Sequence, residues 1–164
     1  MSATQTENNY AFIDSQNLNL AVQDQGWKLD WEKFRIYLKD THKFTKAYLF
    51  IGYVPTNQGL YTSLQNKGYI LVFKPTLKLP SGKPKGNVDG ELIMHAILEG
   101  QNYDKAVIVA GDGDYYCLIE QLKKEDRLKS LVIPNRYRYS SLLRAFTEDM
   151  SFVTDIRHKV EYTK

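Results

Sequence analysis

Short apolar runs alternate along the chain with segments in which apolar residues recur at helical spacing. The runs predict buried strands at residues 10–13, 46–54, 69–73, 106–110 and 130–133, and a short strand at 151–153. The helical spacing predicts helices at 31–42, 60–68, 88–100 and 118–125, with shorter ones after residue 15 and at 140–146. Because strands alternate with helices, we expect an α/β fold with a mainly parallel central sheet of five to six strands.

The chain has the length of a single domain, with 164 residues. Residues 1–9 are polar and are expected to form a disordered tail, residues 10–156 the domain, and residues 157–164 a polar C-terminal tail. The longest irregular stretch is 74–87, which is rich in proline and glycine. Loops of this length within a compact domain are often functional, so this loop is a candidate part of a site.

The composition excludes some classes of protein. Hydrophobic residues make up 43% of the chain and charged residues 25%, and no run is long enough to cross a bilayer. The N-terminus lacks the basic start and apolar centre of a secretory signal, so we expect no membrane association and a cytoplasmic location. The single cysteine, Cys117, cannot form an internal disulfide, and its neighbours predict a place on a buried helix face.

Aspartates stand where predicted strands end and where one predicted helix begins. Asp14 follows the first strand, Asp112 and Asp114 follow the strand at 106–110, and Asp89 begins the helix after the long loop. The carboxyl ends of parallel strands meet at one edge of a sheet, so these side chains could converge there. Carboxylates gathered together repel unless a cation neutralises them, and oxygen ligands favour Mg²⁺ or Mn²⁺ over zinc. Taken alone, Asp89 is better explained as a helix N-cap.

Two clusters of basic residues could contact phosphate groups. The net charge of +3 is small, but the first cluster lies in the long loop and the second follows the strand at 130–133, where tyrosines accompany it. Either cluster alone could equally be a solvated surface. The clusters consist of Lys74, Lys78, Lys83 and Lys85, and of Arg136, Arg138 and Arg144 with Tyr137 and Tyr139.

Three segments resemble the signature segments of the NYN domain, the LabA-like branch of the PIN-like nuclease superfamily. They are residues 12–18 (FIDSQNL), 85–89 (KGNVD) and 110–115 (AGDGDY), in the family's order, and the resemblance runs from about residue 10 to 155. Residues 140–146 and 152–153 also resemble the closing helix and strand of the family. The resemblance implies a PIN-like three-layer α/β/α sandwich and metal-dependent cleavage of RNA.

The resemblance also assigns roles to individual residues. Asp14, Asp89 and Asp112 would be the principal acids around the metal, and Asp114 would complete the cluster. Asn17 would orient an acid or contact the substrate. Lys85 precedes the metal-site aspartate, as a basic residue often does in the family. Ser15 stands where the family usually has glycine, and a serine has less access to positive φ, which could narrow the approach to the metal.

The leading hypothesis is therefore an endoribonuclease that uses Mg²⁺ or Mn²⁺ to hydrolyse single-stranded RNA, with Lys83, Lys85, Arg136 and Arg138 contacting the strand. The alternative is a non-catalytic RNA-binding or protein-interaction module that keeps the acidic pocket. A phosphohydrolase fits poorly because Asp14 is followed by Ser15-Gln16 and so does not begin an Asp-x-Asp pattern, and no G-x-G-x-x-G supports a dinucleotide site. A second subunit or another protein remains open as a partner that supplies specificity.

Overall fold

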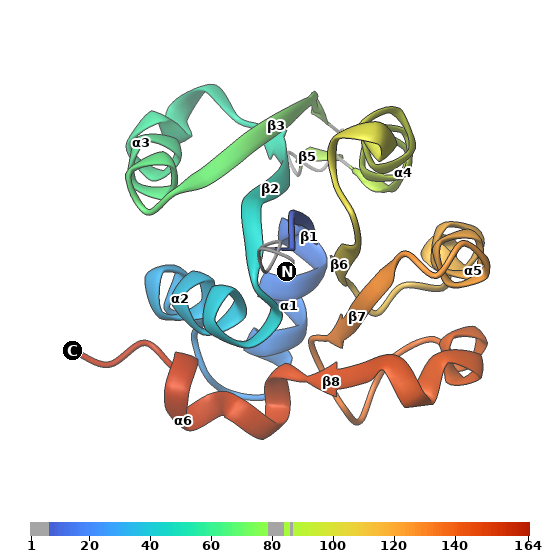
Figure 1. The fold of residues 1–164 in the computed structure, drawn as a ribbon. Helices are drawn as coiled ribbons and strands as arrows, with labels where there is room; N and C mark the ends of the chain where they lie inside the picture. Colours follow the sequence, from blue (N-terminus) through green and yellow to red (C-terminus); the bar gives the residue numbers. More distant parts are fainter. Residues whose placement is uncertain (1–6, 79–83, 86) are drawn as a thin grey trace, which may run out of the picture.

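A six-stranded parallel sheet forms the middle layer of the molecule in this computed structural model (Figure 1). The structure describes residues 7–78, 84–85 and 87–164, and of residues 77–78 and 84–85 it describes the backbone alone. The strands of the sheet are β1 (Asn9–Asp14), β2 (Phe44–Tyr53), β3 (Tyr69–Pro75), β6 (Ala106–Val109), β7 (Leu128–Ile133) and β8 (Met150–Phe152). The α/β class and the mainly parallel sheet are thus confirmed.

Helices cover both faces of the sheet (Figure 1). One face carries α1 (Ser15–Asp24), α2 (Trp31–His42), α3 (Gln58–Asn66) and α6 (Arg157–Val160), and the other carries α4 (Asp89–Leu98), α5 (Tyr116–Lys124) and the 3-10 segment η4 (Ser141–Asp149). Shorter 3-10 turns connect them: η1 (Pro55–Asn57), η2 (Gly100–Asn102), η3 (Gly113–Tyr115) and η5 (Val153–Ile156). The result is the expected three-layer α/β/α sandwich.

The central strands are apolar on both faces because each face has its own core. On β1, Phe12 packs with Leu92 of α4 and Leu118 of α5, whereas its neighbour Ile13 packs with Leu18 of α1 on the other side. All are essentially fully buried. Burial of each such side chain contributes roughly 1.5–3 kcal/mol to folding. This two-sided burial is why the strands appear in the sequence as nearly continuous apolar runs.

The order of the strands reverses between β1 and β6. The sheet runs β3-β2-β1-β6-β7-β8, so the chain builds outward from β1 to β3 and then returns to the other side of β1 to build β6 to β8. Residues 10–13 of β1 pair in parallel with residues 106–109 of β6. In open α/β sheets, ligands bind in the crevice outside the carboxyl ends of the strands at such a reversal. Asp14 ends β1, and residues 110–114 follow β6, so both lie at this crevice.

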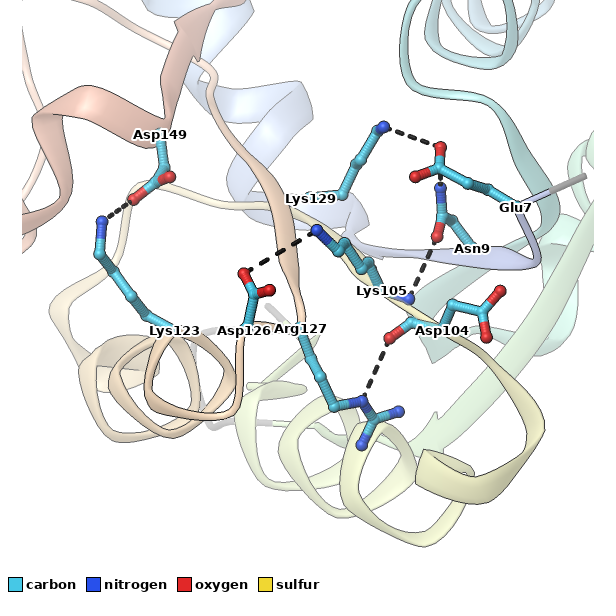
Figure 2. A network of polar contacts seen from close by, with 9 residues as sticks. All are labelled: Glu7, Asn9, Asp104, Lys105, Lys123, Asp126, Arg127, Lys129 and Asp149. Carbon is cyan, nitrogen blue, oxygen red and sulfur yellow. Dashed lines mark hydrogen bonds and ion pairs between the residues drawn. The ribbon is translucent and has the colours of Figure 1, made fainter. Parts of the chain in front are cut away.

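The opposite, amino-terminal edge of the sheet is closed by a polar network (Figure 2). Asn9, at the start of β1, accepts a hydrogen bond from the backbone of Lys105 and donates to the carbonyls of His42 and Lys43. Arg127 donates to the carbonyl oxygens of residues 100, 103 and 104, which follow α4. These contacts satisfy backbone groups at helix ends. The network therefore stabilises the fold at the edge away from the acidic residues.

Several local expectations are corrected by the structure. The loop at 74–87 contains a short antiparallel pair, β4 (Leu77–Lys78) with β5 (Pro84–Lys85). The C-terminal segment is not only a polar tail, because residues 157–160 form α6 and Val160 is fully buried. Asn9, placed in the N-terminal tail, is the buried first residue of β1; residues 1–6 lie outside the described residues. Cys117 is exposed rather than buried. Among the described residues, no helix is both long and apolar enough to cross a membrane.

Candidate acidic site at the sheet edge

Asp14 is a buried carboxylate fixed by two hydrogen bonds. It is the last residue of β1 and the N-cap of α1, where its Oδ1 accepts from the backbone N–H of Asn17 at 3.0 Å. Its Oδ2 accepts from the hydroxyl of Tyr115 at 2.8 Å. Only 6% of Asp14 is exposed. The side chain is thus held in one orientation at the carboxyl end of the sheet, and each oxygen has one protein donor.

The turn after β6 places Asp112 beside Asp14. Asp112 caps η3, and its Oδ1 accepts from the N–H of Asp114 at 2.9 Å. Gly113 lies where no side chain fits, because a Cβ there would be 2.5 Å from the Oγ of Ser140. The Oδ1 of Asn17 accepts from the N–H of Gly111 at 2.8 Å and so ties this turn to the start of α1. The two turns that carry acids are therefore joined by one asparagine.

Asp89 begins α4 but is not its N-cap. The cap position is occupied by Val88, which offers no side-chain bond, so the capping explanation of Asp89 is wrong. Instead Asn87 accepts from the N–H of Asp89 at 3.2 Å, and the Oδ1 of Asp89 accepts from the N–H of Gly90 at 2.9 Å. Lys74 donates to the carbonyl of Asn87. These contacts fix the first turn of α4.

The acids perturb one another electrostatically. The pKa of Asp14 is raised, first because burial disfavours its charged form and further because Asp112 and Asp89 are negative; the bonds from Asn17 and Tyr115 oppose this. The pKa of Asp114 is also raised, chiefly by the charge of Asp112 and by a hydrogen bond with Asp89. Burial and the charge of Asp14 raise the pKa of the Tyr115 hydroxyl, so it remains a donor. The four carboxylates therefore form one interacting group.

Asp14 and Asp112 open into one cavity of about 350 Å³. Asn17 and Arg138, both expected to contact substrate, line the same cavity. Arg136 lies apart from it, because its guanidinium forms two hydrogen bonds with Asp155 and stacks over the ring of Phe152. Lys83 and the side chain of Lys85 lie outside the described residues. The structure thus assembles the acids with one of the two expected arginines.

Other residues at the site were missed by the sequence analysis. Asp24, Gln16 and Asn87 also line the cavity, and the hydroxyl of Tyr115 donates a hydrogen bond to Asp14. For Asp24 a signal was present, because positions 17, 21 and 24 share one face of α1, and all three line the cavity. For Tyr115 the only signal was its place as the last residue of the segment 110–115 that resembles a family signature, which assigned it no role. Ser15 raises no conformational problem, since it begins α1 without positive φ.

The donor set suits a hard divalent cation in its chemistry. Burial and the neighbouring carboxylates raise the pKa of Asp14, and the charge of Asp112 raises the pKa of Asp114; a bound cation would relieve the repulsion between these charges. As their side chains stand, however, the described residues contain no group of three or more His, Cys, Asp or Glu arranged to hold one metal ion. Binding an ion through three of the acids would therefore require side-chain rotations.

A three-layer α/β/α sandwich with an acidic cavity at the reversal of strand order fits the PIN-like class of α/β domains. The sequence profile of the NYN domain matches residues 10–153, and the chain belongs to this family. It is 26% identical to the low amplitude and bright protein LabA of Synechococcus elongatus over 163 residues, which covers 93% of this chain and 87% of that protein. A protein of unknown function from Vibrio parahaemolyticus shares the fold, with a TM-score of 0.79 at 18% identity, over 99% of this chain and all of that one. Family membership indicates a PIN-like nuclease or RNA-related function.

Proposed function

We propose that the protein is an endoribonuclease that hydrolyses single-stranded RNA with Mg²⁺ or Mn²⁺. The observation that carries the proposal is the pair Asp14 and Asp112, which lie on adjacent turns at the reversal of strand order and line one cavity. Asp89 and Asp114 are close enough to act on the same group of charges. A substrate phosphate is itself negative, so a site of this charge could accept it only together with a cation.

In this proposal Asp14, Asp89 and Asp112 hold the ion, with Asp114 in support. When bound, a divalent ion of this kind lowers the pKa of a coordinated water and neutralises charge on the phosphate oxygens. Asn17 keeps the two acid-bearing turns together, and Tyr115 limits rotation of Asp14 through its hydroxyl. Arg138, on the rim of the same cavity, supplies a cation for a phosphate of the strand.

The test is cleavage of an unstructured RNA labelled at one end, in Mn²⁺ and in EDTA. Asp112→Asn should abolish the metal-dependent cleavage and keep the thermal unfolding transition, because the amide oxygen can still cap η3. The matched control is Asp40→Asn, which makes the same change on the exposed surface of α2 and should cut at the wild-type rate. Full activity of Asp112→Asn would refute the assignment of the acids.

One observation favours a second candidate, an RNA-binding module without catalysis. The described residues contain no ready set of three metal ligands, and both oxygens of Asp14 already accept hydrogen bonds within the protein. Under this candidate, binding of single-stranded RNA would be unchanged by EDTA, and no RNA would be cut at any metal concentration. The cleavage assay above and a binding assay in EDTA together separate the two functions.

A further inference from the structure

A second, larger cavity lies on the other side of α1 from the acidic site. Its volume is about 850 Å³, within the range of ligand-binding pockets. We call it the α1–α3 groove. Its walls are α1, the segment that enters α2, and α3, which lie on one side of the sheet (Figure 1), and the carboxyl end of the sheet strand β2. Ile51, Gly52 and Val54 form its floor at the end of β2, so the groove opens at the same edge of the sheet as the acids.

The lining of the groove combines amide and apolar side chains. Asn19, Gln23 and Asn57 supply amides, and the large apolar residues Leu20 and Leu60 remain 50% and 45% exposed. Amide side chains can donate to and accept from the edges of unpaired bases, and apolar side chains can pack against their faces. The lining is therefore matched to bases more than to phosphates.

The charges of the groove support this distinction. It contains two lysines and two acids, Lys28 and Lys67 with Asp30 and Glu32, so they balance. Three of these four charged side chains already make contacts within the protein. Lys28 lies 4.7 Å from the ring centre of Tyr162, Lys67 donates to Ser63, and Asp30 caps α2. A phosphate chain along the floor would find little net positive charge, whereas uncharged bases would meet no repulsion.

The groove and the acidic cavity adjoin each other across the first turns of α1. Gln16 and Leu20 line both of them. A strand whose phosphate lies beside Asp14 and Asp112 can therefore continue over these two side chains and into the groove without leaving the sheet edge. A duplex could not do so with its bases turned inward, because their edges and faces are already paired and stacked.

We propose that the α1–α3 groove binds unpaired bases of the RNA strand that adjoins the phosphate in the acidic site. The proposal rests on the proposed function, since it takes RNA as the substrate, and it adds the place where single-stranded character is recognised. The groove selects for unpaired nucleotides through amide and apolar contacts, and the acidic cavity acts on the backbone next to them.

The test measures binding of fluorescent RNA by anisotropy in an Asp112→Asn background, so that no strand is cut. Leu60→Glu places a negative charge in the groove, at a residue exposed enough for the fold to tolerate it. Ile36→Glu is the matched control, because Ile36 is 55% exposed on α2 and does not line the groove. For an RNA of about eight nucleotides, Leu60→Glu should raise Kd about tenfold, as expected for one lost base contact. Ile36→Glu should leave Kd unchanged.

Varying the length of the RNA and the salt concentration tests the proposed base contacts more specifically. A dinucleotide is too short to occupy both cavities, so its weaker binding should not respond to Leu60→Glu. The milder Asn57→Ala should weaken binding of the longer RNA by the same factor at low and high salt, because an amide contact releases no counterions. As an independent measurement, RNA carrying 4-thiouridine should crosslink under ultraviolet light to peptides of α1 and α3.

The outcomes separate this proposal from the proposed function. Equal Kd values for Leu60→Glu and Ile36→Glu, with no crosslink to α1 or α3, overturn the groove proposal even if the wild type cuts RNA. Weaker binding by Leu60→Glu in a protein that never cuts RNA supports the groove and refutes the nuclease. If the wild type binds no single-stranded RNA at all, both are refuted.

Discussion

At the scale of single residues, the acidic site is held by bonds that few other side chains could make. Asn17 uses its backbone N–H for Asp14 and its side-chain oxygen for Gly111, so one residue spans two turns. Tyr115 is fully buried, yet it directs its hydroxyl to Asp14. A buried carboxylate without such donors would be costly to ionise. The site therefore depends on residues that would look like ordinary core or cap residues in the sequence.

His42 gives a pH-dependent prediction at the same scale. It lies buried in the last turn of α2, and burial together with nearby Lys129 lowers its pKa below 6.5. A folded-state pKa below the unfolded one means that His42 adds stability above pH 6.5, which is lost as pH falls through the folded value. We expect His42→Leu to lose less unfolding free energy than the wild type between pH 7 and pH 5.

Urea denaturation at a series of pH values measures this difference. His158→Leu is the control, because His158 is exposed on α6 and should keep the wild-type pH dependence. Identical pH profiles for the wild type and His42→Leu would contradict a neutral, buried His42.

At the scale of elements, the sequence predicted the strands and helices whose positions are determined by apolar periodicity and by capping residues. The apolar runs predicted β1, β2, β3, β6 and β7 to within a few residues. The central strands β1 and β6 are buried on both faces and must be apolar throughout, whereas the edge strand β3 is partly exposed but keeps a short apolar run. The start of the helix predicted at 31–42 is also confirmed, because Asp30 is the N-cap of α2 and its carboxylate accepts from the N–H of Lys33. The convergence of Asp14 with Asp112 could be anticipated because parallel strands end at one edge. The bonds of Asn17 and Tyr115 could not, since they join residues about a hundred positions apart.

The elements that periodicity missed are short and are formed by tertiary contacts. Each strand of the β4–β5 pair is only two residues long, which is too short for an alternation of apolar and polar residues to be recognised in the sequence. Segment 157–164 has a polar composition, but α6 packs against α2, and the chain after it forms a bridge from Glu161 to Leu29. One buried residue, Val160, anchors this segment, and a single apolar residue is no helical pattern.

Val160 therefore carries a prediction at the scale of the element. Val160→Ala should lower the free energy of unfolding by about 2 kcal/mol, through lost burial and a small cavity beneath α6. His158→Ala, on the exposed side of the same helix, should change it by less than about 0.5 kcal/mol. Chemical denaturation checks both variants. An equally small effect of Val160→Ala would mean that α6 contributes no packing energy.

At the scale of the whole molecule, the sheet separates structural and functional polar groups. The network around Asn9 and Arg127 closes the amino-terminal edge, where it satisfies helix ends and strand starts (Figure 2). The acids gather at the other edge, where burial, together with the charges of Asp112 and Asp89, raises the pKa of Asp14, and the charge of Asp112 raises the pKa of Asp114. Like charges held together destabilise a fold, so a cluster of this kind is expected where function requires it. This asymmetry supports the proposal that the acidic edge binds a cation.

A cation that binds only the folded protein must stabilise it, and this gives the last prediction. By linkage, Mn²⁺ at about 100 times its Kd should add about 2.7 kcal/mol to the unfolding free energy and raise the Tm. Asp14→Asn and Asp112→Asn should each lose most of this shift, because each removes a charged ligand from the acidic group, whereas Asp40→Asn should keep all of it. Differential scanning calorimetry in Mn²⁺ and in EDTA measures the shift without reference to cleavage. A wild type whose Tm is unmoved by Mn²⁺, or Asp14→Asn and Asp112→Asn variants that respond as strongly as the wild type, would show that the acids bind no cation.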